Sequence, residues 1–104
     1  MQKNNNVVGI CMQLRLTLYA KYFYKILDGS KKIEYRKLSD YYKKKFDKNN
    51  YETILFINGY GNKRPFMVVK LNKIIKIKDY YELHLGNVLE VGNIKQNDNL
   101  FYID

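Results

Sequence analysis

A change of hydrophobic period at Gly29 constrains the fold of this chain more than any other feature of its sequence. Before this glycine, apolar residues recur at spacings of three and four, which predicts one buried face of a helix. These residues are Tyr19, Tyr22, Phe23, Ile26 and Leu27. Glycine adopts positive φ at little cost, so Gly29 is expected to end the helix with a positive φ. A strand is expected to follow the turn.

Three charged side chains follow this turn: Lys31, Glu34 and Arg36. Glu34 and Arg36 share one face of the expected strand, because side chains on a strand alternate with a period of two. Lys31 lies in the turn and can lean toward either of them. The pattern predicts that the three side chains converge on one cleft, either as a site for a polar ligand or as a local clasp of ion pairs.

The length of the chain predicts one domain. Its 104 residues are enough to enclose a single core, and 46% of them are hydrophobic. A disordered leader is expected at residues 1–9, and a single domain at residues 10–104. The predicted class is α+β, a small β-barrel flanked by two short helices. The helices are expected after N-caps at Thr17 and Ser39, and the main strands at residues 10–16, 51–57, 66–78, 87–94 and 100–103.

Cysteine and histidine are nearly absent. One cysteine, Cys11, excludes an internal disulfide and a cysteine-based zinc site, and one histidine, His84, excludes a histidine-rich metal site. No apolar run approaches the roughly 20 residues that cross a bilayer. The sequence therefore predicts a cytoplasmic protein without membrane association, metal or other cofactor, and it leaves the oligomeric state open.

The charge of the chain favours a polyanionic partner. Its formal charge is +9, from 19 Lys and Arg against 10 Asp and Glu. An AT-rich genome would give the same abundance of Lys and Asn without selection for binding. Lys70, Lys76 and Lys78 fall on the even-numbered face of the strand expected at residues 66–78, which predicts a basic stripe along one sheet face.

A glycine-containing loop follows the strand at residues 51–57. In it, Tyr60 can stack on an unpaired base while Arg64 binds phosphate. The alternative is that Tyr60 only half-covers the mouth of the barrel.

The string Gly-x-Lys-x-x-Glu-x-Arg at residues 29–36, placed after this helix and before paired strands, resembles the ASCH domain of the PUA-like superfamily. The resemblance implies a PUA-like barrel that binds RNA, a nucleotide or a nucleoside in a cleft between the first helix and the barrel. It also implies that Lys31 lies in that cleft. Together with the charge pattern, it predicts the ligand-binding residues Lys31, Lys32, Glu34, Arg36, Tyr60, Arg64, Lys70 and Lys76.

Two alternatives remain open. Acetylcytidine amidohydrolases of the same superfamily use a lysine, a threonine and a glutamate; Lys31 matches their lysine, but Glu34 occupies the threonine position. If the chain is such an enzyme, or a ribonuclease, the expected catalytic residues are Lys31, Glu34 and Glu82, with Glu90 a more distant candidate for the glutamate. The second alternative is a regulatory module that binds proteins.

Overall fold

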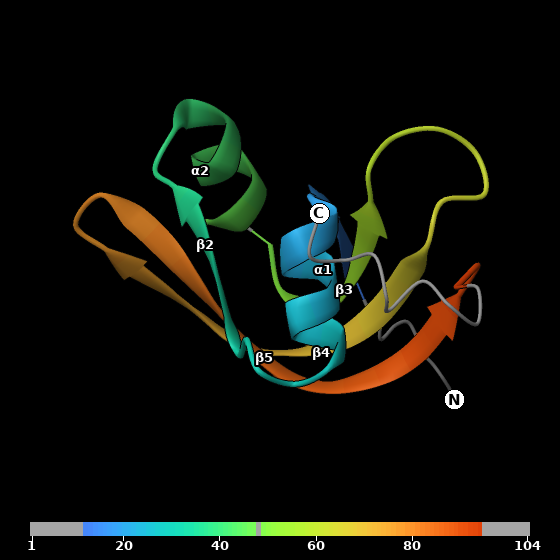
Figure 1. The fold of residues 1–104 in the computed structure, drawn as a ribbon. Coiled ribbons are helices and arrows are strands. Elements are labelled where there is room, and N and C mark those ends of the chain that lie inside the picture. Colours follow the sequence, from blue (N-terminus) through green and yellow to red (C-terminus); the bar gives the residue numbers. More distant parts are fainter. Residues whose placement is uncertain (1–11, 48, 95–104) are drawn as a thin grey trace, which may run out of the picture.

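The computed structural model describes residues 12–47 and 49–94. They form a five-stranded curled sheet and two helices, an α+β fold in which the sheet is a half-barrel (Figure 1). The elements in chain order are β1 (Met12–Leu18), α1 (Ala20–Leu27), β2 (Ile33–Lys37), α2 (Asp40–Phe46), β3 (Tyr51–Asn58), β4 (Phe66–Ile77) and β5 (Tyr80–Gly92). The leader expected at residues 1–9 and the strand expected at residues 100–103 lie outside the described residues.

The strand order is β1-β3-β4-β5-β2, so β1 and β2 are the two edges of the sheet. β1 pairs with β3 in parallel, and the other pairs are antiparallel. The strand expected at residues 87–94 is the second half of β5, which continues through Gly92 from Tyr80. Figure 1 shows α1 within the curve of the sheet, where it covers the concave face.

The core lies between α1 and this concave face. β1 alternates as predicted, with Leu14, Leu16 and Leu18 buried. Helix α1 contributes Phe23 and Ile26 from its apolar face. The remaining strands and α2 contribute Phe46, Ile54, Phe56, Met67, Val69, Leu71, Tyr81, Leu83 and Leu85.

Helix α1 begins at a different residue from the one predicted, but it ends as predicted. The prediction that Thr17 is the N-cap is wrong, because Thr17 belongs to β1. The N-cap is Tyr19, which makes no side-chain capping hydrogen bond. The other end is confirmed, because Gly29 has a φ of 87° and donates its N–H to the carbonyl of Ile26 at 3.1 Å. This turn starts the chain toward β2 at the far edge of the sheet.

Helix α2 begins at the predicted cap. The Ser39 hydroxyl accepts a hydrogen bond from the backbone N–H of Tyr42 at 3.2 Å. Phe46, at the other end of the helix, is buried and packs edge-on against Tyr81 at a centroid distance of 4.9 Å. α2 is thereby fixed against β5, and Tyr42 with it.

The basic stripe predicted along β4 is wrong, because the pairing of β4 with β5 changes register between Leu71 and Lys73. The core face carries Leu71 before this irregularity and Ile74 after it, so the alternation shifts by one residue. Lys70 therefore lies on the outer face of the sheet. Lys76 lies on the same face as Tyr81, its partner in register.

Candidate functional site

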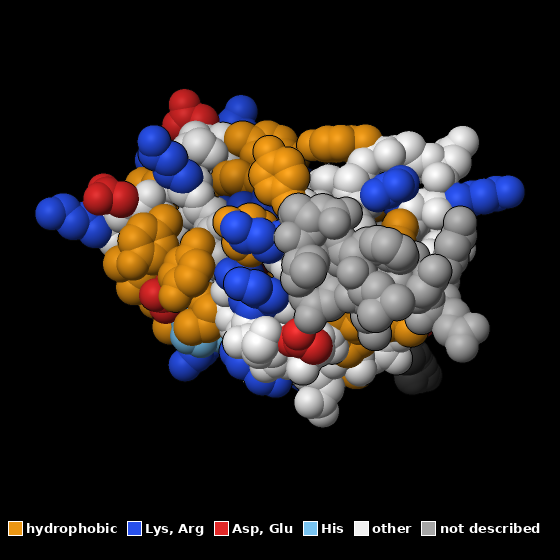
Figure 2. Space-filling model, viewed as in Figure 1, with side chains coloured by type: hydrophobic (Ala, Val, Ile, Leu, Met, Phe, Trp, Pro, Cys, Tyr) orange, Lys and Arg blue, Asp and Glu red, His pale blue; other side chains and the backbone are white. Residues whose placement is uncertain are grey.

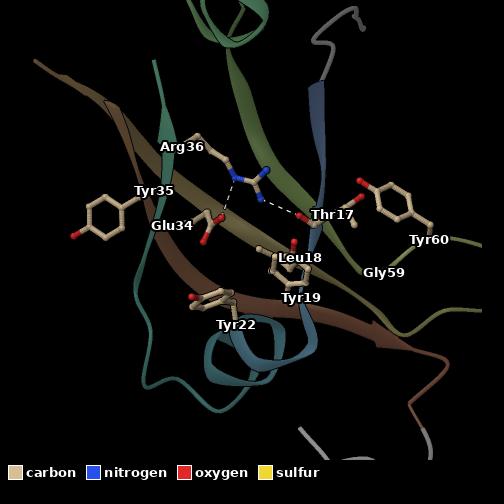
Figure 3. A pocket seen from close by; sticks show the side chains of 9 residues that line it. All are labelled: Thr17, Leu18, Tyr19, Tyr22, Glu34, Tyr35, Arg36, Gly59 and Tyr60. Carbon is tan, nitrogen blue, oxygen red and sulfur yellow. Dashed lines mark hydrogen bonds and ion pairs between the residues drawn. The ribbon is translucent and has the colours of Figure 1, made fainter. Parts of the chain in front are cut away.

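A pocket of 430 Å³ opens where the curled sheet fails to close, between the end of β1 and β2 (Figure 3). Its lining comes from the two edge strands, the start of α1 and the loop after β3. The lining residues are Thr17, Leu18, Tyr19, Tyr22, Glu34, Tyr35, Arg36, Gly59 and Tyr60. The volume lies in the range of small-molecule sites, about 300 to 1,000 Å³.

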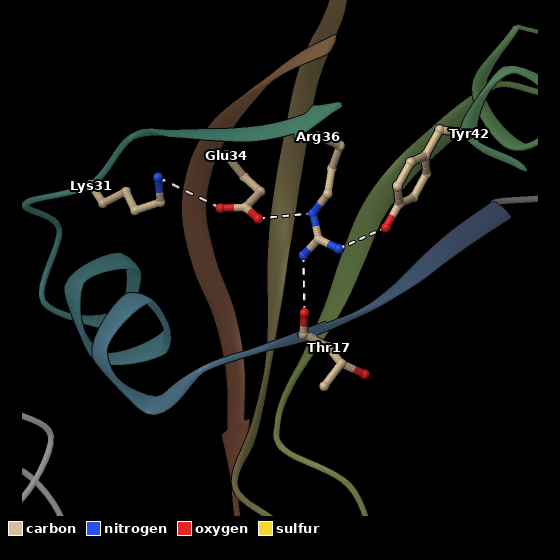
Figure 4. A network of polar contacts seen from close by, with 5 residues as sticks. All are labelled: Thr17, Lys31, Glu34, Arg36 and Tyr42. Atoms are coloured by element: carbon tan, nitrogen blue, oxygen red, sulfur yellow. Dashed lines mark hydrogen bonds and ion pairs between the residues drawn. The ribbon is translucent and has the colours of Figure 1, made fainter. Parts of the chain in front are cut away.

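The structure brings Lys31, Glu34 and Arg36 together beside this pocket (Figure 4). Glu34 is a buried residue, only 7% exposed. Its Oε2 accepts a hydrogen bond from Arg36 Nε at 2.9 Å, and its Oε1 lies 3.6 Å from Lys31 Nζ. The two cations approach the carboxylate from opposite sides (Figure 4). The motif thus forms a compact row of cation, anion and cation.

Arg36 also spans the gap in the half-barrel. Its Nη2 donates to the carbonyl of Thr17 on β1 at 3.0 Å, and its Nη1 donates to the Tyr42 hydroxyl on α2 at 2.8 Å. One side chain on β2 therefore contacts the opposite sheet edge, the second helix and Glu34. A rigid guanidinium suits this task, because its donors point in several fixed directions in one plane.

Four tyrosines line the pocket. Tyr19 and Tyr60 are 81% and 87% exposed, and Tyr22 is 39% exposed. Two further contacts involve Lys31, whose Nζ lies 5.7 Å from the ring centroid of Tyr22 and 5.4 Å from that of Tyr35. Figure 2 shows large hydrophobic side chains beside Lys and Arg on this face of the molecule. The opening therefore combines exposed ring faces with charged groups at its floor.

Three of these tyrosines, Tyr19, Tyr22 and Tyr35, are site residues that sequence reasoning missed, whereas Tyr60 was predicted. Tyr19 and Tyr22 were expected to belong to the apolar face of α1, and their exposure corrects that prediction. Their position at the start of the helix that precedes the charged motif, together with 11 tyrosines in the chain, was the signal available in the sequence. Tyr35, inside the motif, was overlooked in the same way; Figure 3 shows it on the other side of β2 from Glu34.

Of the predicted ligand-binding residues, Glu34, Arg36 and Tyr60 line this pocket, whereas Lys31 lies next to Glu34 outside its lining. Lys32 lines a second pocket of 410 Å³ with Lys31, the end of α1 and the middle of β5. Arg64 lines a third, beside Arg15, and its Nε donates to the carbonyl of Asn58 at 2.7 Å. Arg64 thus fixes the loop that carries Tyr60, and the two do not share the pocket.

Lys70, Lys76 and Glu82 are placed elsewhere. Lys76 Nζ lies 3.4 Å from Asp47 Oδ2, whereas Lys70 is on the outer face of β4. Glu82 alternates with the buried residues of β5, so it faces away from Glu34, and its Oε1 lies 3.0 Å from His84 Nε2. The structure therefore brings the predicted catalytic glutamate together with His84 and not with Lys31.

The pKa values of Asp47 and Tyr81 are both shifted where the end of α2 contacts β5. The Tyr81 hydroxyl donates to Asp47 Oδ1 at 2.9 Å. This hydrogen bond lowers the pKa of Asp47, and the neighbouring Lys76 lowers it further against the opposing effect of burial. Burial, with the Asp47 hydrogen bond second, raises the pKa of Tyr81. These contacts hold α2 in place and thereby position the Tyr42 hydroxyl beside Arg36.

In residues 12–47 and 49–94, no three His, Cys, Asp or Glu side chains are grouped so that they could hold a metal ion. Over the same residues, neither helix is long and apolar enough to cross a membrane. No protein family, curated protein or solved structure matches the chain significantly. The geometry of the site is therefore the guide to its function.

Proposed function

We propose that this chain is an ASCH-like domain of the PUA-like superfamily that binds an unpaired base of RNA, or a nucleotide, in the pocket between β1 and β2. The observation that carries the proposal is the combination of exposed Tyr19, Tyr22 and Tyr60 with the charged pair Glu34 and Arg36 in one 430 Å³ opening.

The aromatic part of the pocket suits a flat ring. Large rings exposed to water at a concave site give stacking surface, and every base has a face on which to stack. Tyr60 projects from a loop at one side of the opening, and Tyr19 and Tyr22 lie at the start of α1 (Figure 3). A base that enters between them would exchange water for ring faces on more than one side.

The charged part of the pocket suits the polar edge of a base and its phosphate. Glu34 is an acceptor at the floor, and Lys31 is a cation next to it. Lys31 also lines the second pocket together with Lys32, which offers further positive charge to a phosphate on that side of Glu34. A nucleotide whose base meets Glu34 and whose phosphate lies near these lysines would have complementary charges at both ends.

The test compares Tyr60→Ala and Tyr19→Ala with Tyr41→Ala. Tyr41 is 63% exposed on α2 and does not line the pocket, so it is a matched control. We expect each pocket variant to weaken the binding of a mixed-sequence single-stranded RNA by about 5- to 150-fold, the range for losing one stacking ring. Tyr41→Ala should bind as the wild type does.

Binding is measured by fluorescence anisotropy of labelled RNA at low ionic strength, with NMR shifts of the tyrosine rings as a second readout. The proposal fails if single-stranded RNA and nucleotides do not bind at low salt. It also fails if Tyr41→Ala weakens binding as much as the two pocket variants do.

A further inference from the structure

The charged groups at the floor of the pocket indicate which base the pocket accepts. We propose, building on the proposed function, that the pocket selects guanine and that Glu34 reads the adjacent N1–H and N2–H donors of that base. Glu34 keeps hydrogen-bonding capacity for a ligand beside its contacts with Arg36 and Lys31.

Glu34 has unused acceptor positions that face the pocket. A carboxylate offers about four lone-pair positions. In the described part of the chain, one is used by Arg36 Nε at 2.9 Å, and a longer contact of 3.6 Å joins the other oxygen to Lys31 Nζ. Because these cations stand on opposite sides of the carboxylate (Figure 4), the positions between its two oxygens are left for a ligand.

Arg36 and the backbone carbonyls at the floor already have hydrogen-bond partners. Arg36 uses Nε for Glu34, Nη1 for Tyr42 and Nη2 for Thr17. The Thr17 carbonyl is in turn occupied by Arg36, and the Leu18 carbonyl by the backbone N–H of Gly59 at 3.1 Å. Among the groups that line the pocket, Glu34 therefore offers a ligand two adjacent acceptor oxygens with spare lone pairs.

Guanine has the matching edge among the four RNA bases. It presents two neighbouring N–H donors, which two carboxylate oxygens can accept in parallel. Adenine and cytosine each present a ring-nitrogen acceptor beside an amino group, and uracil presents one N–H between two carbonyls. Each of those three would direct an oxygen or nitrogen lone pair at Glu34. The acceptor on the same edge of guanine, O6, would fall at one side of the carboxylate, where Lys31 or Arg36 lies.

The experiment titrates the wild-type protein with the RNA pentamers UUGUU, UUAUU, UUCUU and UUUUU, and with free GMP to separate the base from the chain. We expect UUGUU to bind tenfold or more tightly than the other three, within the range for one good bidentate contact to a base. A pentamer with 1-methylguanine at the centre should lose this advantage, because methylation removes the N1–H donor. Inosine, which lacks only the 2-amino group, should lie between guanine and 1-methylguanine.

The matched variants are Glu34→Gln and Glu82→Gln. Glutamine at position 34 presents an amide donor to the donors of guanine, so the preference for UUGUU should disappear. Glu82, paired with His84 on the opposite sheet face, is the control, and Glu82→Gln should keep the preference. If Glu34→Gln fails to fold, the comparison of bases on the wild-type protein still decides the matter.

The outcomes distinguish guanine selection from the binding of bases in general. Equal binding of the four pentamers, or a preference that survives 1-methylation, overturns guanine selection and leaves base binding in place. A preference for another base also overturns it. Absence of binding to every pentamer and to GMP overturns both proposals.

Discussion

Replacing Arg36 by methionine is the most direct test of how the half-barrel is held together. Methionine keeps much of the length of the side chain but removes every donor. The change leaves the Thr17 carbonyl, the Tyr42 hydroxyl and one oxygen of Glu34 without their arginine partner, at contacts of 3.0, 2.8 and 2.9 Å. It therefore cuts the side-chain link between β2, β1 and α2 in one step.

The magnitude follows from the kinds of bond that are lost. A hydrogen bond in which one partner is charged contributes about 1.5 to 3 kcal/mol, and the Arg36 guanidinium is the charged donor in all three. The Arg36 side chain is 17% exposed, so water can replace part of what is lost. We therefore expect the free energy of unfolding to fall by about 3 kcal/mol, less than the sum of the three bonds. For a domain of this size, that lowers the melting temperature by about 12 to 24 °C.

The assay is urea unfolding followed by circular dichroism, with Arg15→Met as the control. Arg15 is exposed on β1 and makes none of these contacts, so its replacement should change stability by no more than about 0.5 kcal/mol. A double-mutant cycle of Arg36→Met with Glu34→Gln should give a coupling of about 1 kcal/mol or more. If Arg36→Met is no more destabilising than Arg15→Met, the link across the gap does not stabilise the fold.

Two further predictions concern the turn and the docking of α2. Gly29→Ala should cost about 1 to 2 kcal/mol in urea unfolding, because its φ of 87° is unfavourable for an L-residue, and Gly29→Asn should recover part of this loss; equal stability of all three proteins would contradict the role of the turn. The lowered pKa of Asp47 stabilises the fold above the pKa of about 3.9 of an unfolded aspartate, and this contribution is lost as the pH falls through the lowered value. Asp47→Asn should therefore be less stable than the wild type at pH 7 and lose less stability on acidification from about pH 4 to pH 2, measured by urea midpoints, whereas parallel pH profiles would contradict this assignment.

The turn at Gly29 and the meeting of Lys31, Glu34 and Arg36 could be predicted because they depend on nearby residues. A helix with one apolar face, a glycine after it and a period of two thereafter are all visible within about a dozen residues. Ser39 as the cap of α2 has the same local origin. The gap between β1 and β2 could not be predicted in this way, because it depends on how far the whole sheet curls.

The failure of the stripe on β4 has a different cause. From Leu71 to Ile77, apolar residues and lysines do not keep one period, so the sequence alone permits either face to be buried. The partner strand decides the matter: Leu85 pairs with Leu71 and Leu83 with Ile74, and the irregularity between these pairs keeps both within the core. A single shift of register was enough to place Lys70 and Lys76 on opposite faces of the sheet.

Tyr19 and Tyr22 were misassigned because a tyrosine has both an apolar ring and a polar hydroxyl, so a hydrophobic pattern does not distinguish a core position from a pocket wall. Tyr24 and Tyr22 illustrate this, since both lie in α1 and only Tyr24 is buried. The distinction arises from the opening above Glu34, which leaves Tyr22 without a covering element. Exposure at this helix is a property of the half-barrel and not of the residue type.

The same opening connects stability with the proposed binding. Edge strands present unpaired backbone groups, and closing the sheet would satisfy them but would also remove the pocket. Here Arg36 satisfies the Thr17 carbonyl with a side chain, which holds the two edges together while the space between them stays open. Glu34 orients that arginine and also faces the pocket. A loss of RNA binding in Arg36→Met would therefore reflect the position of the edges as much as a lost contact, whereas variants of Tyr60, which lies on the loop, report on the ligand directly.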